Sequence, residues 1–61
     1  MDHATAQKLI ARGYVAIVYV HYSYSDKEKG DLVSKHKSYE AAERAARSCR
    51  LWGVRFLDEI A

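Results

Sequence analysis

The longest run of β-branched and aromatic residues in the chain is YVAIVYVHYSY, residues 14–24. In an extended strand its even-numbered residues face one side and its odd-numbered residues face the other, and both sides are apolar as far as Val20. A strand that is apolar on both faces is usually covered on both faces. The pattern therefore predicts that residues 14–24 form the central strand of a small sheet.

A charged segment, DKEKGD at residues 26–31, separates this strand from a second β-like run. It contains Gly30 and predicts a hairpin loop of three to five residues. The run that follows, LVSKHK at residues 32–37, is short and rich in lysine, which is typical of an edge strand. If the loop has four residues, 27–30, we expect Tyr24 to face Val33 and His21 to face His36 across the hairpin.

The first segment of the chain, residues 2–12, predicts a short helix. Either Asp2 or Thr5 is suited to the N-cap position, and Gly13 follows the last turn, where a glycine often ends a helix. A helix this short is marginal alone. We therefore expect it to form only if its narrow apolar stripe docks on the rest of the domain.

A longer helix is predicted over residues 39–52, YEAAERAARSCRLW, beginning after Ser38 and ending before Gly53. One side carries small and aromatic residues, with Cys49 expected in the core, and suits close packing on a sheet. The other side is charged, and Glu40–Arg44 and Glu43–Arg47 have the spacing of favourable i,i+4 pairs.

The last segment, residues 54–60, predicts a third strand, bulged near Asp58. Because the helix at residues 39–52 returns the chain across the sheet, this strand can pair antiparallel with the central strand on its free side. The predicted fold is a single small α+β domain covering residues 1–61, with element order α-β-β-α-β. Its three-stranded antiparallel sheet has strand order 2-1-3. The long helix covers one face, and the first helix or a second copy of the protein covers the other.

Size and composition limit how such a domain is stabilised. A chain of 61 residues builds a small core, and small domains often add a disulfide, a metal or a partner subunit. Cys49 is the one cysteine, so an internal disulfide is excluded. A lone thiol also suits a reducing compartment. We therefore expect a homodimer and a cytoplasmic location.

The charge balance is mild, with a formal net charge of +2. That excess allows a basic patch without requiring one. The N-terminus lacks the apolar core of a signal peptide, and the apolar run at residues 14–20 is too short to cross a bilayer. These features predict a soluble protein without a membrane role.

Aromatic and basic residues together suggest one ligand class, nucleic acid. Tyrosines on a sheet flanked by lysines can stack bases and hold phosphates, and arginines along a helix can follow a phosphate backbone. The same residues also suit ordinary strand packing and a solvated helix face. The candidate nucleic-acid-binding residues are Lys35, Lys37, Arg44, Arg47, Tyr22 and Tyr24.

Catalytic and metal chemistry find little support in the sequence. His21 and His36 are two zinc ligands at most, and a site needs three or four. Cys49 sits at the end of a helix that does not activate a thiol. No P-loop, G-x-S-x-G motif or paired-carboxylate arrangement is present. We therefore expect no enzyme activity, no cofactor and no small-molecule substrate.

The run from Leu32 to Ile60 resembles the strand, capped helix, glycine and strand pattern of several small bacterial domains. It also resembles, loosely, the arm-binding domains of phage integrases, which bind DNA with a three-stranded sheet followed by a helix. This chain differs by placing a strand after the helix. The resemblance implies a bacterial or phage-type accessory module that binds nucleic acid.

Two functions are consistent with these observations. The first is a non-enzymatic binding module whose ligand is nucleic acid. The alternative is a protein-interaction or homo-oligomerisation module without a nucleic-acid ligand, in which the second sheet face and Leu51 meet a partner.

Overall fold

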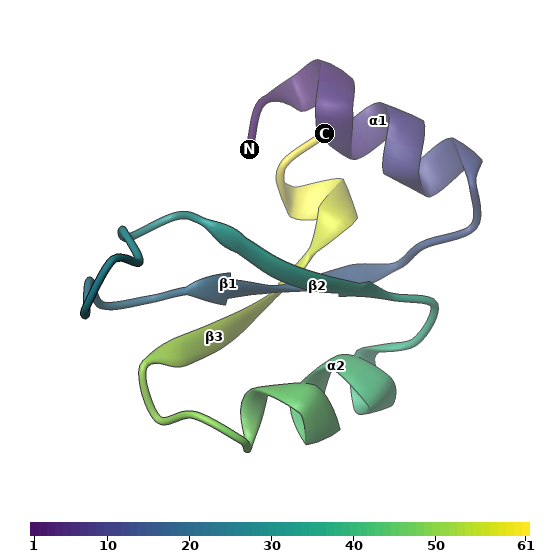
Figure 1. Cartoon of the computed structure of the whole chain (residues 1–61). Coiled ribbons are helices and arrows are strands. Elements are labelled where there is room, and N and C mark those ends of the chain that lie inside the picture. Colours follow the sequence, from purple (N-terminus) through teal and green to yellow (C-terminus); the bar gives the residue numbers. More distant parts are fainter.

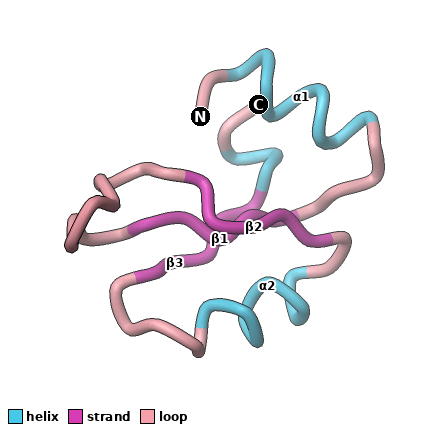
Figure 2. Tube along the Cα trace, viewed as in Figure 1, coloured by secondary structure: helices cyan, strands magenta, loops and turns pink.

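The computed structural model describes all residues, 1–61, as a sheet between two helical layers (Figures 1 and 2). The elements are, in order, α1 (His3–Ala11), β1 (Ala16–Val20), β2 (Leu32–His36), α2 (Tyr39–Ala46), β3 (Trp52–Phe56) and a final 3-10 turn, η1 (Leu57–Glu59). The sheet is antiparallel with order β2-β1-β3. The predicted fold class, element order and strand order are confirmed.

The central strand β1 separates two small apolar clusters, as its two-sided pattern predicted. Its three even-numbered residues are fully buried, and two of them, Ala16 and Val18, cluster with Ala42 of α2. On the other side, Ile17 is buried among residues of α1 and η1, including Leu9 and Leu57. Figure 1 accordingly places α2 on one face of the sheet, with α1 and the C-terminal turn on the other. Of the two covers expected for the second face, the first helix or a second copy of the protein, α1 therefore covers part of that face from within the same chain.

Both helices begin at side-chain caps. The Asp2 carboxylate accepts a hydrogen bond from the Thr5 N–H at 2.8 Å, and the Ser38 hydroxyl accepts one from the Ala41 N–H at 3.1 Å. Hydrogen bonding by Thr5, mainly through its side chain, lowers the pKa of the Asp2 carboxyl below its ordinary value. Gly13 follows α1 with a φ of +91°, a left-handed conformation that glycine adopts at little cost. The predicted caps and the glycine at this helix end are present.

The second helix is shorter than predicted. It ends at Ala46, and the chain then turns through i→i+3 hydrogen bonds from Ser48 to Ala45 and from Cys49 to Ala46. The prediction of a helix reaching residue 52 was wrong because Trp52 pairs with Val20 in the sheet. Gly53 is consequently a strand residue, and Cys49 is half-buried in the turn.

The hairpin loop is longer than predicted and covers residues 21–31. Val20 is the last residue of β1, and its N–H and C=O bond to Asp31 and Gly30. Inside the loop, the Ser23 hydroxyl accepts from the Lys29 N–H at 3.0 Å. Such local bonds replace the ladder that a longer strand would make. The expected pairings of Tyr24 with Val33 and of His21 with His36 were therefore wrong, and His36 lies opposite Ala16.

The C-terminal strand ends at Phe56, and residues 57–59 form the turn η1. The prediction of a strand to residue 60 was wrong for a packing reason. Leu57 and Ile60 are both buried against α1, at 0% and 8% exposure. In a strand, two residues three apart face opposite sides, whereas in a 3-10 turn they lie on the same side.

Candidate functional site

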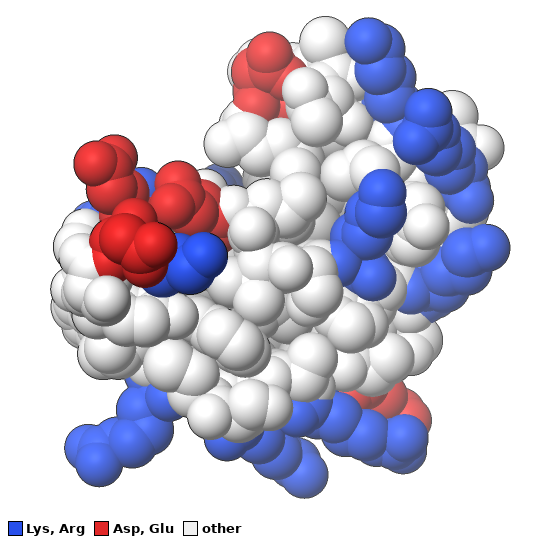
Figure 3. Space-filling model, viewed as in Figure 1, with Lys and Arg blue, Asp and Glu red and all other residues white.

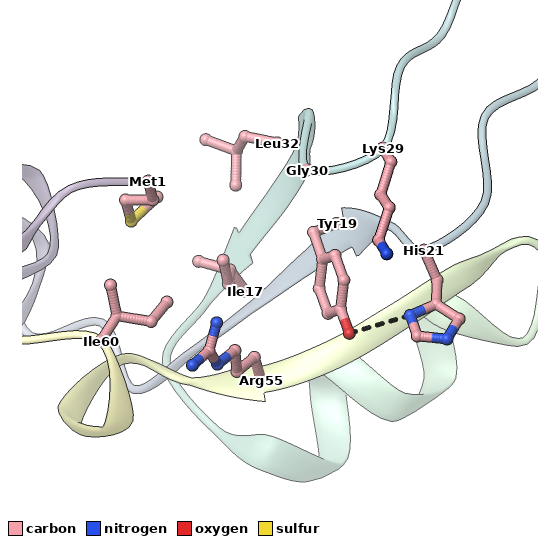
Figure 4. A pocket seen from close by; sticks show the side chains of 9 residues that line it. All are labelled: Met1, Ile17, Tyr19, His21, Lys29, Gly30, Leu32, Arg55 and Ile60. Atoms are coloured by element: carbon pink, nitrogen blue, oxygen red, sulfur yellow. Dashed lines mark hydrogen bonds between the residues drawn. The ribbon is translucent and has the colours of Figure 1, made fainter.

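A hollow opens on the α1 side of the sheet, next to the part of β1 that α1 does not cover. Its volume is about 290 Å³, and its floor includes Ile17, Tyr19 and Leu32 (Figure 4). Lys29 reaches toward it from the β1–β2 loop, and Arg55 points into it from β3. No carboxylate is among the lining residues. The hollow thus combines an apolar floor with two cations.

The ring of Tyr19 is held by one neighbour on β3 and one in the β1–β2 loop. It lies over Gly53 of β3, where a Cβ atom would come within 3.0 Å of the Tyr19 Cζ and Oη atoms. Its hydroxyl is 3.2 Å from His21 Nδ1, and the two rings meet edge to face with centroids 5.8 Å apart. Tyr22 adds a further edge-to-face contact with His21 at 4.5 Å. A group of aromatic rings therefore stands at one side of the hollow.

The cations extend beyond the hollow along the same face. Register places Lys35 of β2 and Arg55 of β3 on either side of Ile17. Directly opposed residues point to the same face, so the two cations flank the apolar floor. Arg55 is held near Glu59, with Nε 3.9 Å from Oε2, in the single ion pair of the structure. Lys35 has no carboxylate partner.

A second basic cluster surrounds Tyr14 at the end of this face. The Nζ atoms of Lys35 and Lys37 lie 5.1 Å and 5.5 Å from the Tyr14 ring centroid, within the range of cation–π attraction. Figure 3 shows basic side chains gathered here, over the end of β2 and the C-terminal half of α1, whereas acidic side chains gather on the β1–β2 loop. The charges are therefore segregated despite the small net charge.

The structure divides the six predicted nucleic-acid-binding residues among three places. Lys35 and Lys37 meet at Tyr14. Arg44 and Arg47 belong to α2, on the opposite side of the sheet, where they line a shallow depression with Glu40 and Glu43. The expected pairs Glu40–Arg44 and Glu43–Arg47 are not within ion-pair distance, since Arg55–Glu59 is the single ion pair.

The two predicted tyrosines lie in the β1–β2 loop and differ in their surroundings. Tyr22 is 59% exposed and stands beside His21. Tyr24 is half-buried on the α2 side, where its hydroxyl accepts a hydrogen bond from Trp52 Nε1 at 2.8 Å. Tyr22 is therefore near the hollow, whereas Tyr24 fixes the loop to β3.

The remaining candidate groups stay apart. His36 bonds through Nε2 to the Ser34 hydroxyl at 2.7 Å and is separated from His21 by the length of the sheet. No group of three or more His, Cys, Asp or Glu side chains is placed to hold a metal ion. Leu51 is half-buried, and its carbonyl accepts the N–H groups of His21 and Tyr22.

The hollow and its lining residues were not predicted from the sequence. The alternation of β1 already placed Tyr19 and His21 on the face of Ile17, which was the available signal. Lys29 gave no such signal, because its position depends on the fold of the β1–β2 loop. Arg55 was placed on this face by the pairing of β3 with β1.

Comparison with protein-family models, with curated proteins and with solved structures found no match. The resemblance of residues 32–60 to arm-binding domains therefore rests on the sequence pattern alone. None of the helices has the length and apolar character needed to span a membrane.

Proposed function

We propose that this protein is a small single-stranded nucleic-acid-binding module that uses the α1 side of its sheet. The observation that carries the proposal is the hollow itself, where the Tyr19 and His21 rings stand beside Lys29 and Arg55 with no carboxylate in the lining. Aromatic side chains stack on bases, and neighbouring cations hold the phosphates. The same combination suits a chain that alternates flat bases with negative charges.

The size of the hollow favours an unpaired strand. A volume of about 290 Å³ lies just below the usual range for ligand pockets, which begins at about 300 Å³, and is too small for a duplex. A single splayed base fits this scale, with its flanking phosphates directed toward Lys29 and Arg55 at the hollow and toward Lys35 across the floor from Arg55. The unpaired Lys35 and Lys37 beside Tyr14 extend the path of the strand along the same face.

The number of cations sets the expected salt dependence. Lys29, Lys35 and Arg55 correspond to about three phosphate contacts. For single strands, the logarithm of the binding constant then falls against the logarithm of the salt concentration with a slope of about −2. The competing function, a protein-interaction module, predicts binding through apolar surface that holds or strengthens as salt is added.

The test uses fluorescence anisotropy with short single-stranded RNA and DNA oligonucleotides and two double variants of equal charge. Lys29→Gln with Arg55→Gln removes the cations of the hollow, and we expect binding to weaken at least about tenfold. Arg44→Gln with Arg47→Gln removes the same charge from α2, and we expect a change below about threefold.

Two results would contradict the proposal. One is an equal loss in both double variants, which means that only net charge matters. The other is a larger loss in the α2 variant, which moves the site to Arg44 and Arg47. Tyr19→Leu adds an independent check, because it keeps an apolar floor but removes the stacking ring, and we expect at least about fivefold weaker binding.

A further inference from the structure

The outer edge of β3 carries backbone groups that no strand of this chain uses. Val20 bonds to the β2 side through both its N–H and its C=O, so its neighbours Tyr19 and His21 direct theirs toward β3. In the antiparallel register, Tyr19 lies opposite Gly53 and Ile17 lies opposite Arg55. The alternation therefore turns the N–H and C=O groups of Val54 and Phe56 outward.

The side chains of this edge alternate in a matching way. Trp52 and Val54 pack on the α2 side of the sheet, and Phe56, which shares their parity, stacks on Tyr39 of α2 with ring centroids 4.6 Å apart. Phe56 remains 37% exposed. Arg55 points to the other side, into the hollow.

A two-fold axis through Val54 makes the edge complementary to itself. In this arrangement Val54 pairs with Val54 of a second copy, and Trp52 lies opposite Phe56 of that copy. Val54 and Phe56 direct both backbone groups outward, so the hydrogen-bonding parity is satisfied. Trp52 shares that parity, but its N–H bonds the Cys49 carbonyl within the chain, so its C=O is the group that it offers to the second copy. Aromatic side chains face each other on the α2 side, and cross-strand aromatic pairs are favourable.

Charge and aromatic pairing separate this register from its two nearest alternatives. An axis through Arg55 sets two arginines directly opposite, in the pair type whose Cα atoms approach to about 4.5 Å. An axis through Gly53 removes the pairing of Trp52 with Phe56. The axis through Val54 instead sets each Arg55 opposite Gly53, where there is no side chain to meet it.

The opposite edge of the sheet lacks these properties. The outer side of β2 carries Lys35, with Lys37 just beyond its end, and neither has a carboxylate within ion-pair distance. Edge lysines oppose pairing with another strand. The two edges of this sheet therefore differ, and β3 is the one that accepts a further strand.

We propose that the protein forms a homodimer in which two β3 strands pair antiparallel about an axis through Val54 to make a continuous six-stranded sheet. This inference stands apart from the nucleic-acid ligand, since it depends only on the edge of β3. It has a consequence for the hollow. Because the Tyr19 ring lies over Gly53, Arg55 of the second copy comes next to that ring and completes the hollow from across the axis.

The test uses chemically synthesised chains, because a single N-methyl group can block one backbone N–H without changing a side chain. N-methylation of Val54 removes the two symmetry-related hydrogen bonds at the axis. We expect the dimer dissociation constant, measured by analytical ultracentrifugation without nucleic acid, to rise at least about tenfold. N-methylation of Lys35, whose N–H points outward from β2, is the matched control and is expected to change it less than about twofold.

Neither modified N–H forms a hydrogen bond within the sheet of one chain, so both modified chains are expected to fold. Circular dichroism checks this separately. A chain that is monomeric at millimolar concentration would overturn the proposal, as would an equal or larger effect of the Lys35 modification. The register has its own readout. In a Cys49→Ser background, Val54→Cys is expected to form a disulfide-linked dimer on oxidation, since directly opposed strand residues lie within disulfide reach. Val33→Cys in the same background is expected to remain monomeric, and the reverse result would contradict the β3 interface.

Discussion

The ring of Tyr19 lies against the α-carbon of Gly53, so closely that a Cβ atom at residue 53 would sit 3.0 Å from the Tyr19 Cζ and Oη atoms. The two residues are directly paired across β1 and β3. Because Gly53 has no side chain, it leaves the space that the Tyr19 ring occupies at the side of the hollow.

Substitution of Gly53 should displace this ring in proportion to the size of the new side chain. Gly53→Ala requires a shift of a few tenths of an ångström, which the half-buried ring can make, and we expect the free energy of unfolding to change by less than about 1 kcal/mol. Gly53→Val overpacks the site and should lower it by about 1–3 kcal/mol. Urea denaturation measures both.

The control for this prediction is a double-mutant cycle. In a Tyr19→Leu background the ring is gone, so the cost of Gly53→Val should fall by at least about half. An unchanged cost would mean that the valine clashes with something other than the ring.

The hydrogen bond from Trp52 Nε1 to the Tyr24 hydroxyl, at 2.8 Å, fixes the β1–β2 loop to β3. Tyr24→Phe keeps the ring and removes the acceptor, which should lower the free energy of unfolding by about 1 kcal/mol. We also expect faster amide exchange within residues 21–31, measured by hydrogen–deuterium exchange. Tyr22→Phe is the matched control, since the Tyr22 hydroxyl makes no hydrogen bond within the chain, and it should leave both quantities unchanged.

The cap of α2 depends on one hydroxyl, Ser38 Oγ, which accepts the Ala41 N–H. Ser38→Ala should lower the free energy of unfolding by about 1 kcal/mol, whereas Ser38→Asp keeps an acceptor and should preserve it. Thermal unfolding followed by circular dichroism compares the two. Equal loss in both variants would show that the hydroxyl has another role.

The cap of α1 should make stability sensitive to acid. The folded-state pKa of Asp2 is lowered, so its contribution is fully present above the ordinary value of 3.8 and is lost as the pH falls through the lower folded value. Asp2→Asn keeps an acceptor without a titrating group. We expect the difference in melting temperature between the two proteins to change below about pH 4 and to stay constant above it. A difference that is constant across the whole pH range would contradict this account.

Several features of the fold were predictable because they depend on local patterns. The apolar residues on both faces of β1 required a central strand, and the lysines of β2 indicated an edge, which together determine the order β2-β1-β3. Gly13 and Ser38 were recognised as helix ends, and Asp2 was one of two candidates beside Thr5, because capping depends on neighbours within a few residues.

The candidate site was less predictable, because it is assembled from segments that are distant in sequence. Lys29 belongs to a loop whose shape comes from the bond between its own N–H and Ser23. Arg55 reaches the hollow only because β3 pairs with β1. The predicted site instead combined Lys35 with Arg44, which the fold places on opposite sides of the sheet.

The sequence by itself determined the fold class, the strand order and the helix starts, since alternation and capping are encoded by residues close together in the chain. Tertiary structure decided where α2 ends, why residue 53 is glycine and how the C-terminus turns. In each case the deciding contact is distant in sequence: Trp52 with Val20, Gly53 with Tyr19, and Leu57 and Ile60 with α1. Burial and strand pairing outweigh local propensity at these positions, because their free energies depend on partners that a local pattern does not contain.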